Sequence, residues 1–540
     1  MFLILALFTA VNGVQPADMV VTNARIYTVD SQRPTASAMA IKDGRILFVG
    51  DDVAAYIGTA TKKIDAHGAT VVPGLIDSHG HMESLGEELA TFDLRNVKTV
   101  AEVAAIVRKA AAGKPAGAWI RGQSWDQTNW GGQFPTADDL TAAAPNNPVF
   151  LTRVDGHAAW VNRKALELAG ITAKTPDPPG GKIIRDKTGK PTGILIDRAQ
   201  GLVGEKIPPA TQAEIRDHLL RAAKRCVSVG LTGVGDAGDS EMELAAYRDL
   251  IAKHELPIRV NAMIGGTGKL WQEYMKRGPE IGDRLSVRSV KLFADGAMGS
   301  RGAAFLAPYA DDPGNSGLLM MTKEQIEAVA RDAAAHGFQV CTHAIGDRAN
   351  RITLEAYGAV LGGRNDKRFR IEHAQVVAPE DFQLFAKYSV IAAIQSTHAT
   401  SDMRWVEKRI GPERAKGAYA WRRFLSLGVH ISNGSDFPVE PPNPLWGFYA
   451  AVTRQDHSGN PPGGWYPDQR MTREEALRSW TIDAAYAAFE EKQKGSLTPG
   501  KLADFTMLSN DIMKVPAAEI LKTRVLMTVV GGEVVYSEAK

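Results

Sequence analysis

Short apolar runs alternate with helical patterns along most of the chain, and this alternation restricts the possible folds more than any other feature. Units of this kind are typical of a parallel β-sheet covered by helices. Nine apolar runs qualify as strands, at Leu75–His79, Val149–Arg153, Thr232–Asp236, Ile258–Met263, Ser289–Phe293, Gln339–His343, Phe369–His373, Ile391–Ser396 and Val429–Ser432. Helices of the outer layer are predicted at Lys323–His336 and Thr472–Glu491.

The predicted fold is α/β, a (β/α)8 TIM-like barrel over residues 73–495. The stretch at about 85–205 has loop character and helices of its own, so we assign Val149–Arg153 to an insertion above the barrel. The other eight runs match the number of strands that such a barrel requires.

The two ends of the chain read as short strands. Residues 18–72 and 496–540 both show alternating apolar residues and glycine turns, for example Asp43-Gly44 and Gly531-Gly532. Two β segments at opposite ends of one chain are explained most simply by a shared structure. We therefore predict a small β-sandwich-like domain built from both termini.

Residues 1–17 are interpreted as a secretory signal peptide. The apolar run Phe2–Phe8 is followed by small residues as far as Ala17, and it is too short to cross a bilayer. This predicts an exported protein, periplasmic or secreted. The alternative is a buried first strand, and a cytoplasmic protein if the segment is not cleaved.

Charge and cysteine content exclude several classes of function. Lys+Arg 63 against Asp+Glu 61 gives a net charge of +2 without a basic run, so no nucleic-acid partner is expected. No membrane span is predicted either, and a homo-oligomer remains open. Cys226 and Cys341 are the two cysteines, which excludes a disulfide framework and predicts two free thiols.

A His-x-His motif follows the apolar run that ends at Ile76. His79 and His81 are two residues apart on an extended segment, so both imidazoles can face one ion. Gly80 between them lets the backbone pass close to other groups. Alone, the motif is a weak signal, because a pair of loop or core histidines would look the same.

Three more predicted strands end in side chains that bind metals. His343 and His373 end two of them, and Asp436 follows the last one. A parallel barrel gathers the carboxyl ends of its strands around one mouth, where active sites lie. Four histidines and a carboxylate at such ends suit Zn²⁺ or a similar divalent ion.

These motifs resemble the amidohydrolase superfamily, and in detail its amidohydrolase-3 (YtcJ-like) branch, which includes N-substituted formamide deformylases. The resemblance covers nearly the whole chain after residue 18. The segments that carry it are Val72–His79, Val290–Gly296, Thr342–Asp347, Ser432–Val439 and Gly495–Asp504.

The resemblance also implies a site with two divalent ions. It places His79 and His81 on one metal, His343 and His373 on the other, and Asp436 beside the first. Lys291 would be carboxylated on Nζ by CO₂ and bridge both ions as an anion. An ammonium there would repel the ions. The alternative is an unmodified Lys291 paired with Asp295 and a single metal.

Three further residues are candidates for binding substrate. They are His157, Trp125 and Arg301, and a purely structural role is the alternative for each. His157 matches a histidine that the branch carries within its insertion.

The predicted reaction is hydrolysis of a C–N bond in a small non-peptide amide. Asp436 would accept a proton from water and deliver it to the departing nitrogen. The same residues would also suit a deaminase or a cyclic amidase. A non-catalytic scaffold is the alternative from another class, and the six filled ligand positions disfavour it.

Overall fold

The computed structural model describes residues 15–95, 97–153, 158–178 and 180–538. Two compact units divide the chain, one of residues 1–82 and 222–540, and the other of residues 83–221. The chain passes between them within α1 (Met82–Ala90) and α6 (Gln212–Ser228). The signal peptide prediction falls mainly on residues 1–14, outside the described residues, so export stays a prediction.

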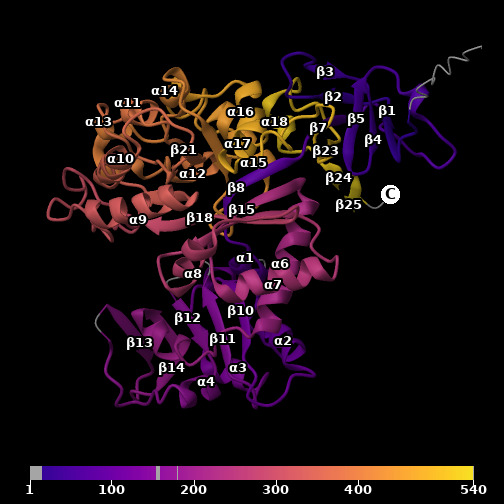
Figure 1. Cartoon of the computed structure of the whole chain (residues 1–540). Coiled ribbons are helices and arrows are strands. Elements are labelled where there is room, and N and C mark those ends of the chain that lie inside the picture. Colours follow the sequence, from indigo (N-terminus) through magenta and orange to yellow (C-terminus); the bar gives the residue numbers. More distant parts are fainter. Residues whose placement is uncertain (1–14, 96, 154–157, 179, 539–540) are drawn as a thin grey trace, which may run out of the picture. The chain divides into compact units, whose positions relative to one another are not determined.

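The larger unit contains a parallel barrel of eight strands, as predicted (Figure 1). Its strands follow the chain order, from β8 (Leu75–Gly80), β15 (Leu231–Asp239), β16 (Arg259–Gly265) and β18 (Leu285–Phe293) to β19 (Gln339–Ala344), β20 (Arg370–His373), β21 (Ile391–Gln395) and β22 (Ile431–Gly434). The short strand β17 (Glu280–Ile281) pairs antiparallel with β18. The first and last strands meet where Ser78 Oγ donates a hydrogen bond to the Asn433 carbonyl at 2.8 Å.

Helices alternate with these strands, because the intervening segments carry apolar residues at helical spacing. They comprise α7 (Glu241–Ala252), α8 (Lys269–Arg277), α9 (Lys323–His336), α10 (Asp347–Leu361), α11 (Phe382–Lys387), α12 (Ser396–Asp402), α13 (Val406–Ala415), α14 (Trp421–Ser426), α15 (Pro444–Thr453), α16 (Arg473–Ser479) and α17 (Ile482–Ala487). The last helix, α18 (Ala517–Ile520), lies in the C-terminal segment after the barrel. α9 has the predicted bounds. Thr322 and Gln325 form a capping box at its start, and Gly337 ends it with a left-handed φ of 79°.

The single helix predicted at Thr472–Glu491 is wrong. The structure has two helices, α16 and α17, separated by non-helical backbone at Thr481, with φ −132° and ψ −97°. The Thr481 hydroxyl donates to the Leu477 carbonyl at 2.7 Å. A threonine that bonds to the preceding turn competes with helical hydrogen bonding, and the sequence pattern does not reveal this.

Two packed sheets near the termini form the predicted β-sandwich. One sheet contains β1 (Met19–Thr22), β4 (Ala38–Lys42), β5 (Arg45–Gly50) and β6 (Lys62–Asp65), and the other contains β2 (Arg25–Tyr27), β3 (Thr35–Ala36), β7 (Thr70–Pro73), β23 (Phe505–Leu508), β24 (Val525–Val530) and β25 (Glu533–Ser537). β7 pairs antiparallel with β23, so the two ends of the chain share one sheet (Figure 1). Met39, Ile41, Val71 and Phe505 pack in the common core.

The smaller unit has a mixed six-stranded sheet of its own. Its strands are β9 (Phe92–Asp93), β10 (Ile120–Trp125), β11 (Val149–Arg153), β12 (Ala158–Val161), β13 (Gly181–Arg185) and β14 (Pro191–Asp197). Its helices are α2 (Val100–Ala111), α3 (Ala137–Thr141), α4 (Arg163–Leu168) and α5 (Gly201–Gly204). The strand that we excluded from the barrel, Val149–Arg153, is therefore β11 of this separate sheet.

Among the described residues, no helix is both long enough and apolar enough to cross a membrane. Cys226 and Cys341 are buried and free, as expected.

A buried ion pair ties barrel strand β16 to the C-terminal segment. Arg259 donates to Asp504 at 2.8 and 3.0 Å, and both side chains are 3% exposed.

We expect Arg259→Met to lower the free energy of unfolding by about 3–5 kcal/mol, because it leaves the Asp504 carboxylate buried and unpaired. Chemical denaturation measures this. Arg331→Met, which removes an exposed pair with Glu327, is the control and should cost less than about 1 kcal/mol. Equal losses in the two variants would contradict the prediction.

Candidate metal centre

The barrel brings all six predicted ligand residues to one mouth. His79 lies on β8 and His81 directly after it, and Lys291, His343 and His373 lie on β18, β19 and β20. Asp436 follows β22 by two residues. Because all these strands are parallel, their carboxyl ends point the same way.

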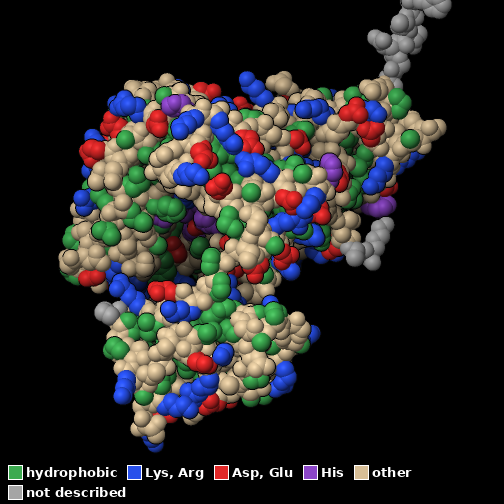
Figure 2. All heavy atoms as spheres, turned by 60° about the horizontal axis from the view of Figure 1, so that its bottom comes forward, with side chains coloured by type: hydrophobic (Ala, Val, Ile, Leu, Met, Phe, Trp, Pro, Cys, Tyr) green, Lys and Arg blue, Asp and Glu red, His purple; other side chains and the backbone are tan. Residues whose placement is uncertain are grey.

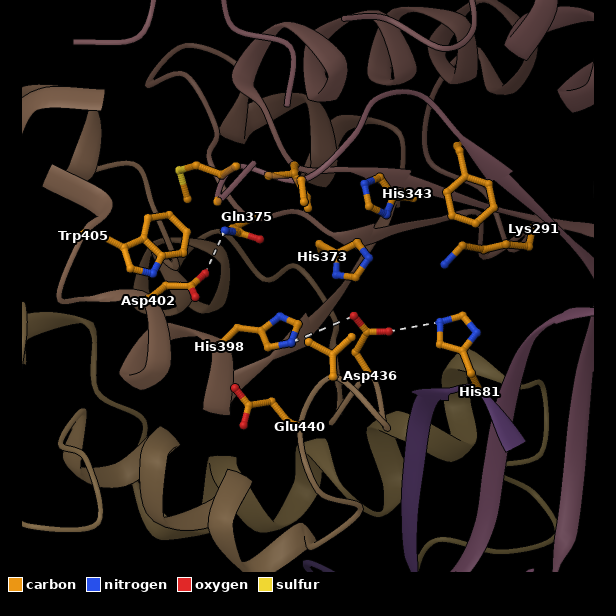
Figure 3. A pocket seen from close by; sticks show the side chains of 16 residues that line it. His81, Lys291, His343, His373, Gln375, His398, Asp402, Trp405, Asp436 and Glu440 are labelled. Carbon is orange, nitrogen blue, oxygen red and sulfur yellow. Dashed lines mark hydrogen bonds and ion pairs between the residues drawn. The ribbon is translucent and has the colours of Figure 1, made fainter. Parts of the chain in front are cut away.

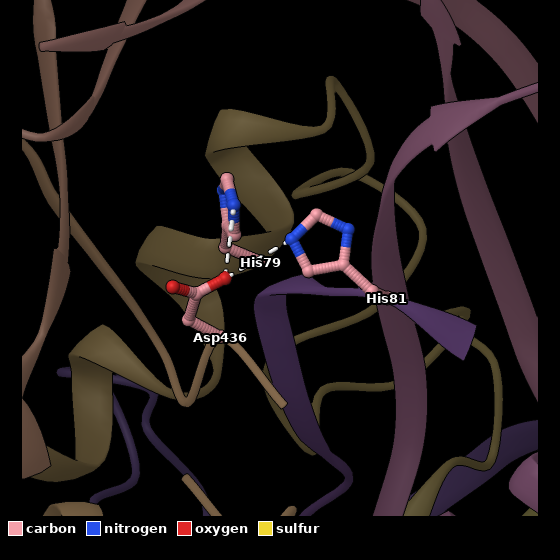
Figure 4. A group of neighbouring side chains, drawn as sticks. All are labelled: His79, His81 and Asp436. Atoms are coloured by element: carbon pink, nitrogen blue, oxygen red, sulfur yellow. Dashed lines mark hydrogen bonds and ion pairs between the residues drawn. The ribbon is translucent and has the colours of Figure 1, made fainter. Parts of the chain in front are cut away.

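His373, His398 and Asp436 form one group that could hold a metal ion, and His79, His81 and Asp436 form another (Figure 4). Within each group, one ligand atom from each residue lies within 4.8 Å of the others. Asp436 Oδ1 is 3.1 Å from His81 Nε2 and 3.5 Å from His79 Nε2. The three side chains therefore point toward a common point.

Two glycines allow this close approach. A Cβ on Gly80 would lie 2.3 Å from the ring of Phe437, and one on Gly434 would lie 2.8 Å from Asp77 Oδ1. Asp77 in turn accepts a hydrogen bond from the Ser435 hydroxyl at 2.6 Å, which fixes the loop that carries Asp436. The backbone can pass here only without a side chain.

Outer partners fix the tautomers of three histidines. The Nδ1 atoms of His79, His81 and His373 face Glu372, the Ala237 carbonyl and Gln395, the last two at 2.8 and 2.7 Å. In a neutral ring, a proton on Nδ1 leaves the lone pair of Nε2 free to bind a metal.

His343 has the opposite orientation. Its Nε2 lies 3.5 Å from the Gly296 carbonyl oxygen, which leaves Nδ1 as the ligand atom. The rings of His343 and His373 are 4.4 Å apart between centroids, so the two imidazoles are direct neighbours.

Lys291 is 1% exposed and lies beside the histidines. Its Nζ is 2.9 Å from His79 Nε2. The pairing with Asp295 that we considered is absent from the described contacts, because Asp295 accepts from the backbone N–H groups of Ala304, Ile345 and Gly346. Burial lowers the pKa of Lys291, which favours the neutral amine.

The electrostatics fit a cation. Burial, followed by the charge of Lys291, lowers the pKa of His79 to about 4 and that of His343 to about 3. Burial alone would raise the pKa of Asp436, but the hydrogen bond from His81 and the nearby histidines hold it well below its usual value. The lone pairs of these uncharged imidazoles and of the Asp436 carboxylate therefore point toward the same place, where a divalent ion would accept them.

A buried chain of charged side chains contacts the Nδ1 side of the His79 ring. Glu372 accepts from His79 and pairs with Arg370 at 2.7 Å, and Arg370 donates to the Ser78 carbonyl at 2.8 Å. Burial would raise the pKa of Glu372, but Arg370 and His79 lower it to about 2. The carboxylate is therefore ionised and holds the His79 ring in place.

Five of the six ligand residues line a cavity of about 400 Å³, and the sixth, His79, is fully buried beside them. Histidine side chains are visible inside a hollow of the surface in Figure 2. Figure 3 shows Lys291, His343, His81 and Asp436 toward one end of the cavity and Trp405 toward the other.

Sequence reasoning missed Glu372, Gln395 and His398. Glu372 directly precedes a predicted ligand, and Gln395 lies inside a predicted strand. His398 follows that strand by two residues and lines the cavity, 9% exposed. The rule that found the other ligands, a histidine at the end of a barrel strand, would have found His398 as well.

Two of the candidate substrate contacts, Trp125 and Arg301, have the structural contacts that were the alternative for each. Trp125 is fully buried in the core of the smaller unit, where its indole N–H donates to the Leu151 carbonyl at 2.8 Å. Arg301 does not line the described cavity, and its guanidinium binds Asp311 at 2.9 Å. His157 lies outside the described residues.

The fold and this site define a metal-dependent hydrolase built on a parallel barrel. Residues 62–536 match the amidohydrolase family model. The chain belongs to the amidohydrolase family, which confirms the resemblance seen in its motifs.

Known relatives are similar over most of their length. The chain is 38% identical to Protein LONG AFTER FAR-RED 3 of Arabidopsis thaliana over 96% of this chain and 92% of that protein. It is 30% identical to N-substituted formamide deformylase of Arthrobacter pascens, over 97% of this chain and 99% of that protein. A crystal structure of an uncharacterized metal-dependent hydrolase from Pyrococcus furiosus is 30% identical, with a TM-score of 0.76, and covers 92% of this chain and 100% of that one.

Glu372 provides a test of the support behind the ligands. We expect Glu372→Gln to weaken metal binding about 10–100-fold, because the His79 ring loses its anionic partner. Metal affinity is measured by competition with a chelator, on protein shown by circular dichroism to be folded. Glu413→Gln, at an exposed pair with Lys416, is the matched control. Unchanged affinity in folded Glu372→Gln would contradict this role.

Proposed function

We propose that this hydrolase cleaves the C–N bond of a small non-peptide amide, such as an N-substituted formamide or an N-acyl amine. The observation that carries the proposal is the convergence of His79, His81, His343 and His373 with the Asp436 carboxylate at one end of a cavity. The similarity to a formamide deformylase over nearly the whole chain supports the bond type.

His79, His81 and Asp436 would hold one divalent ion, and His343 and His373 a second, with zinc suited to both. When bound, such ions polarise a carbonyl and lower the pKa of a water molecule toward neutrality. The outer partners of the histidines keep the ligand atoms directed inward, so little reorganisation is needed when substrate enters.

Asp436 is the residue that moves the proton. Its Oδ1 is next to His81, whereas Oδ2 is 3.9 Å from His398 Nε2 and has no closer ion-pair partner among the described residues. In our proposal Asp436 accepts the proton of the attacking water and gives it to the amine nitrogen as the C–N bond breaks. The products are a carboxylic acid and an amine.

Lys291 would bridge the two ions after modification. A neutral amine can attack CO₂, forming an N–C bond and releasing one proton, and the product is an anionic carbamate. The buried position and lowered pKa of Lys291 favour that neutral amine. This modification explains why a lysine lies among residues that bind cations.

Metal content of the purified protein tests this proposal, with bicarbonate supplied during expression. We expect about two zinc or similar ions per chain and hydrolysis of N-substituted formamides. A double variant, His79→Ala with His81→Ala, should lose at least one ion and nearly all activity. The proposal fails if activity survives in that variant. Hydrolysis of cyclic amides or deamination of rings, with formamides untouched, would instead support the alternative reactions.

The modification of Lys291 can be tested separately. We expect Lys291→Ala to lower activity by a factor of at least about 100, because the bridging anion is missing. Millimolar acetate or propionate should restore part of the activity and the second metal, since a free carboxylate fits the vacated space. Lys323→Ala, outside the site at the start of α9, is the control. No loss of metal in Lys291→Ala would contradict a bridging role.

A further inference from the structure

The cavity has a second end whose chemistry the reaction does not use. Asp402, Trp405 and Glu440 lie toward the side away from Lys291 (Figure 3). Lys291 is the single lysine or arginine among the described lining residues, and it is at the metal end. The far end therefore carries two carboxylates and an aromatic ring.

Neither carboxylate is neutralised by a neighbour. Among the described residues, no lysine, arginine or histidine nitrogen lies within 4.0 Å of Asp402 or Glu440, although ion pairs of this kind are numerous elsewhere. His398 and the exposed Arg404 act on Asp402 only through their charge, beyond ion-pair distance. Burial raises the pKa of Asp402, which is the effect expected of a carboxylate without a cation.

Both carboxylates are nevertheless held in place by neutral donors. Asp402 Oδ2 accepts hydrogen bonds from the Tyr419 hydroxyl and from Gln375 Nε2. Glu440 Oε1 accepts one from the Ser401 hydroxyl. These contacts orient each group, and among the described hydrogen bonds they leave the other oxygen of each carboxylate available.

His398 is a third polar group of the cavity, and Asp436 Oδ2 at 3.9 Å is its one ion-pair contact among the described residues. His398 is 9% exposed, and its Nε2 is buried without a hydrogen bond in the described structure. It lies between the metal end and the acidic end (Figure 3). A buried nitrogen without a hydrogen bond is costly, and a metal ion shared with His373 and Asp436 or a polar atom of a bound substrate would satisfy it.

We infer that the far end of the cavity binds a positively charged group of the substrate, so that the enzyme prefers amides of amines that carry a second, cationic nitrogen. Asp402 and Glu440 would attract its positive charge, and Trp405 would present its aromatic ring to it. His398 would bind a polar atom of the substrate between the two ends. This inference rests on the proposed amide hydrolysis and names the substrate class.

Three formamides of equal length test the preference. The formyl derivatives of hexanediamine, heptylamine and aminohexanoate present a cation, a neutral group and an anion at the same place. We expect the lowest KM for the cationic compound. Asp402→Asn and Glu440→Gln should each raise that KM about tenfold and leave kcat and the KM of the neutral compound unchanged.

The matched control is Glu413→Gln, an exposed carboxylate outside the cavity. Equal KM values for the cationic and neutral compounds in the unaltered protein would overturn the inference, as would a best fit for the anion. Parallel changes with all three compounds in both variants would show a structural role and would also overturn it.

A binding measurement separates this inference from the proposed reaction. Choline has a permanent positive charge, and dimethylbutanol is its uncharged isostere, with carbon in place of nitrogen. Calorimetry should show choline binding to the purified metal-loaded protein more tightly than dimethylbutanol, and Asp402→Asn should remove the difference. If choline binds in this way but no amide is hydrolysed, the cationic subsite stands and the proposed reaction fails. If amides are hydrolysed without a charge preference, and choline binds no better than dimethylbutanol, only the subsite fails.

Discussion

The common direction of the eight barrel strands is the constraint on which the site depends. The strands that contribute ligands supply only one or two such side chains each, and all the barrel strands end at the same rim. Ligands as distant in sequence as His79 and Asp436 meet because β8 and β22 lie side by side. The Ser78–Asn433 hydrogen bond and the approach at Gly434 hold those two strands together. Without this closure, Asp436 would have no histidine to face.

Burial then gives the gathered side chains their character. Removed from water, His79 and His343 lose the tendency to carry a proton, and their outer partners decide which nitrogen keeps a lone pair. The ionised Glu372 can remain buried because Arg370 lies against it at 2.7 Å. The protein itself therefore sets the orientation and the protonation state of these ligand side chains. A chance cluster of histidines would lack such outer partners.

The sequence was sufficient for the barrel because its strands are buried on both faces and appear as continuous apolar runs. It was sufficient for His343 and His373 because a polar residue ending such a run is unusual. It left two roles open for Trp125, because an aromatic residue in a loop-rich segment can face either a pocket or a core. The structure buries Trp125 in the core beside the sheet of the smaller unit. It failed at Thr481, where one side-chain hydrogen bond divides a helix that the sequence pattern makes continuous.

The same physical argument explains both ends of the cavity. At the metal end, unprotonated nitrogen and oxygen atoms of the ligand side chains face one another, and a bound metal ion would satisfy their lone pairs. At the far end, Asp402 and Glu440 are half-buried carboxylates held by neutral donors, and among the described residues neither has a cation within ion-pair distance. Holding a partly desolvated carboxylate without a counter-ion costs free energy, and a cation bound beside it would offset that cost. Since no lysine or arginine of the described lining can reach them, a cation from the substrate is the simplest group that satisfies both carboxylates.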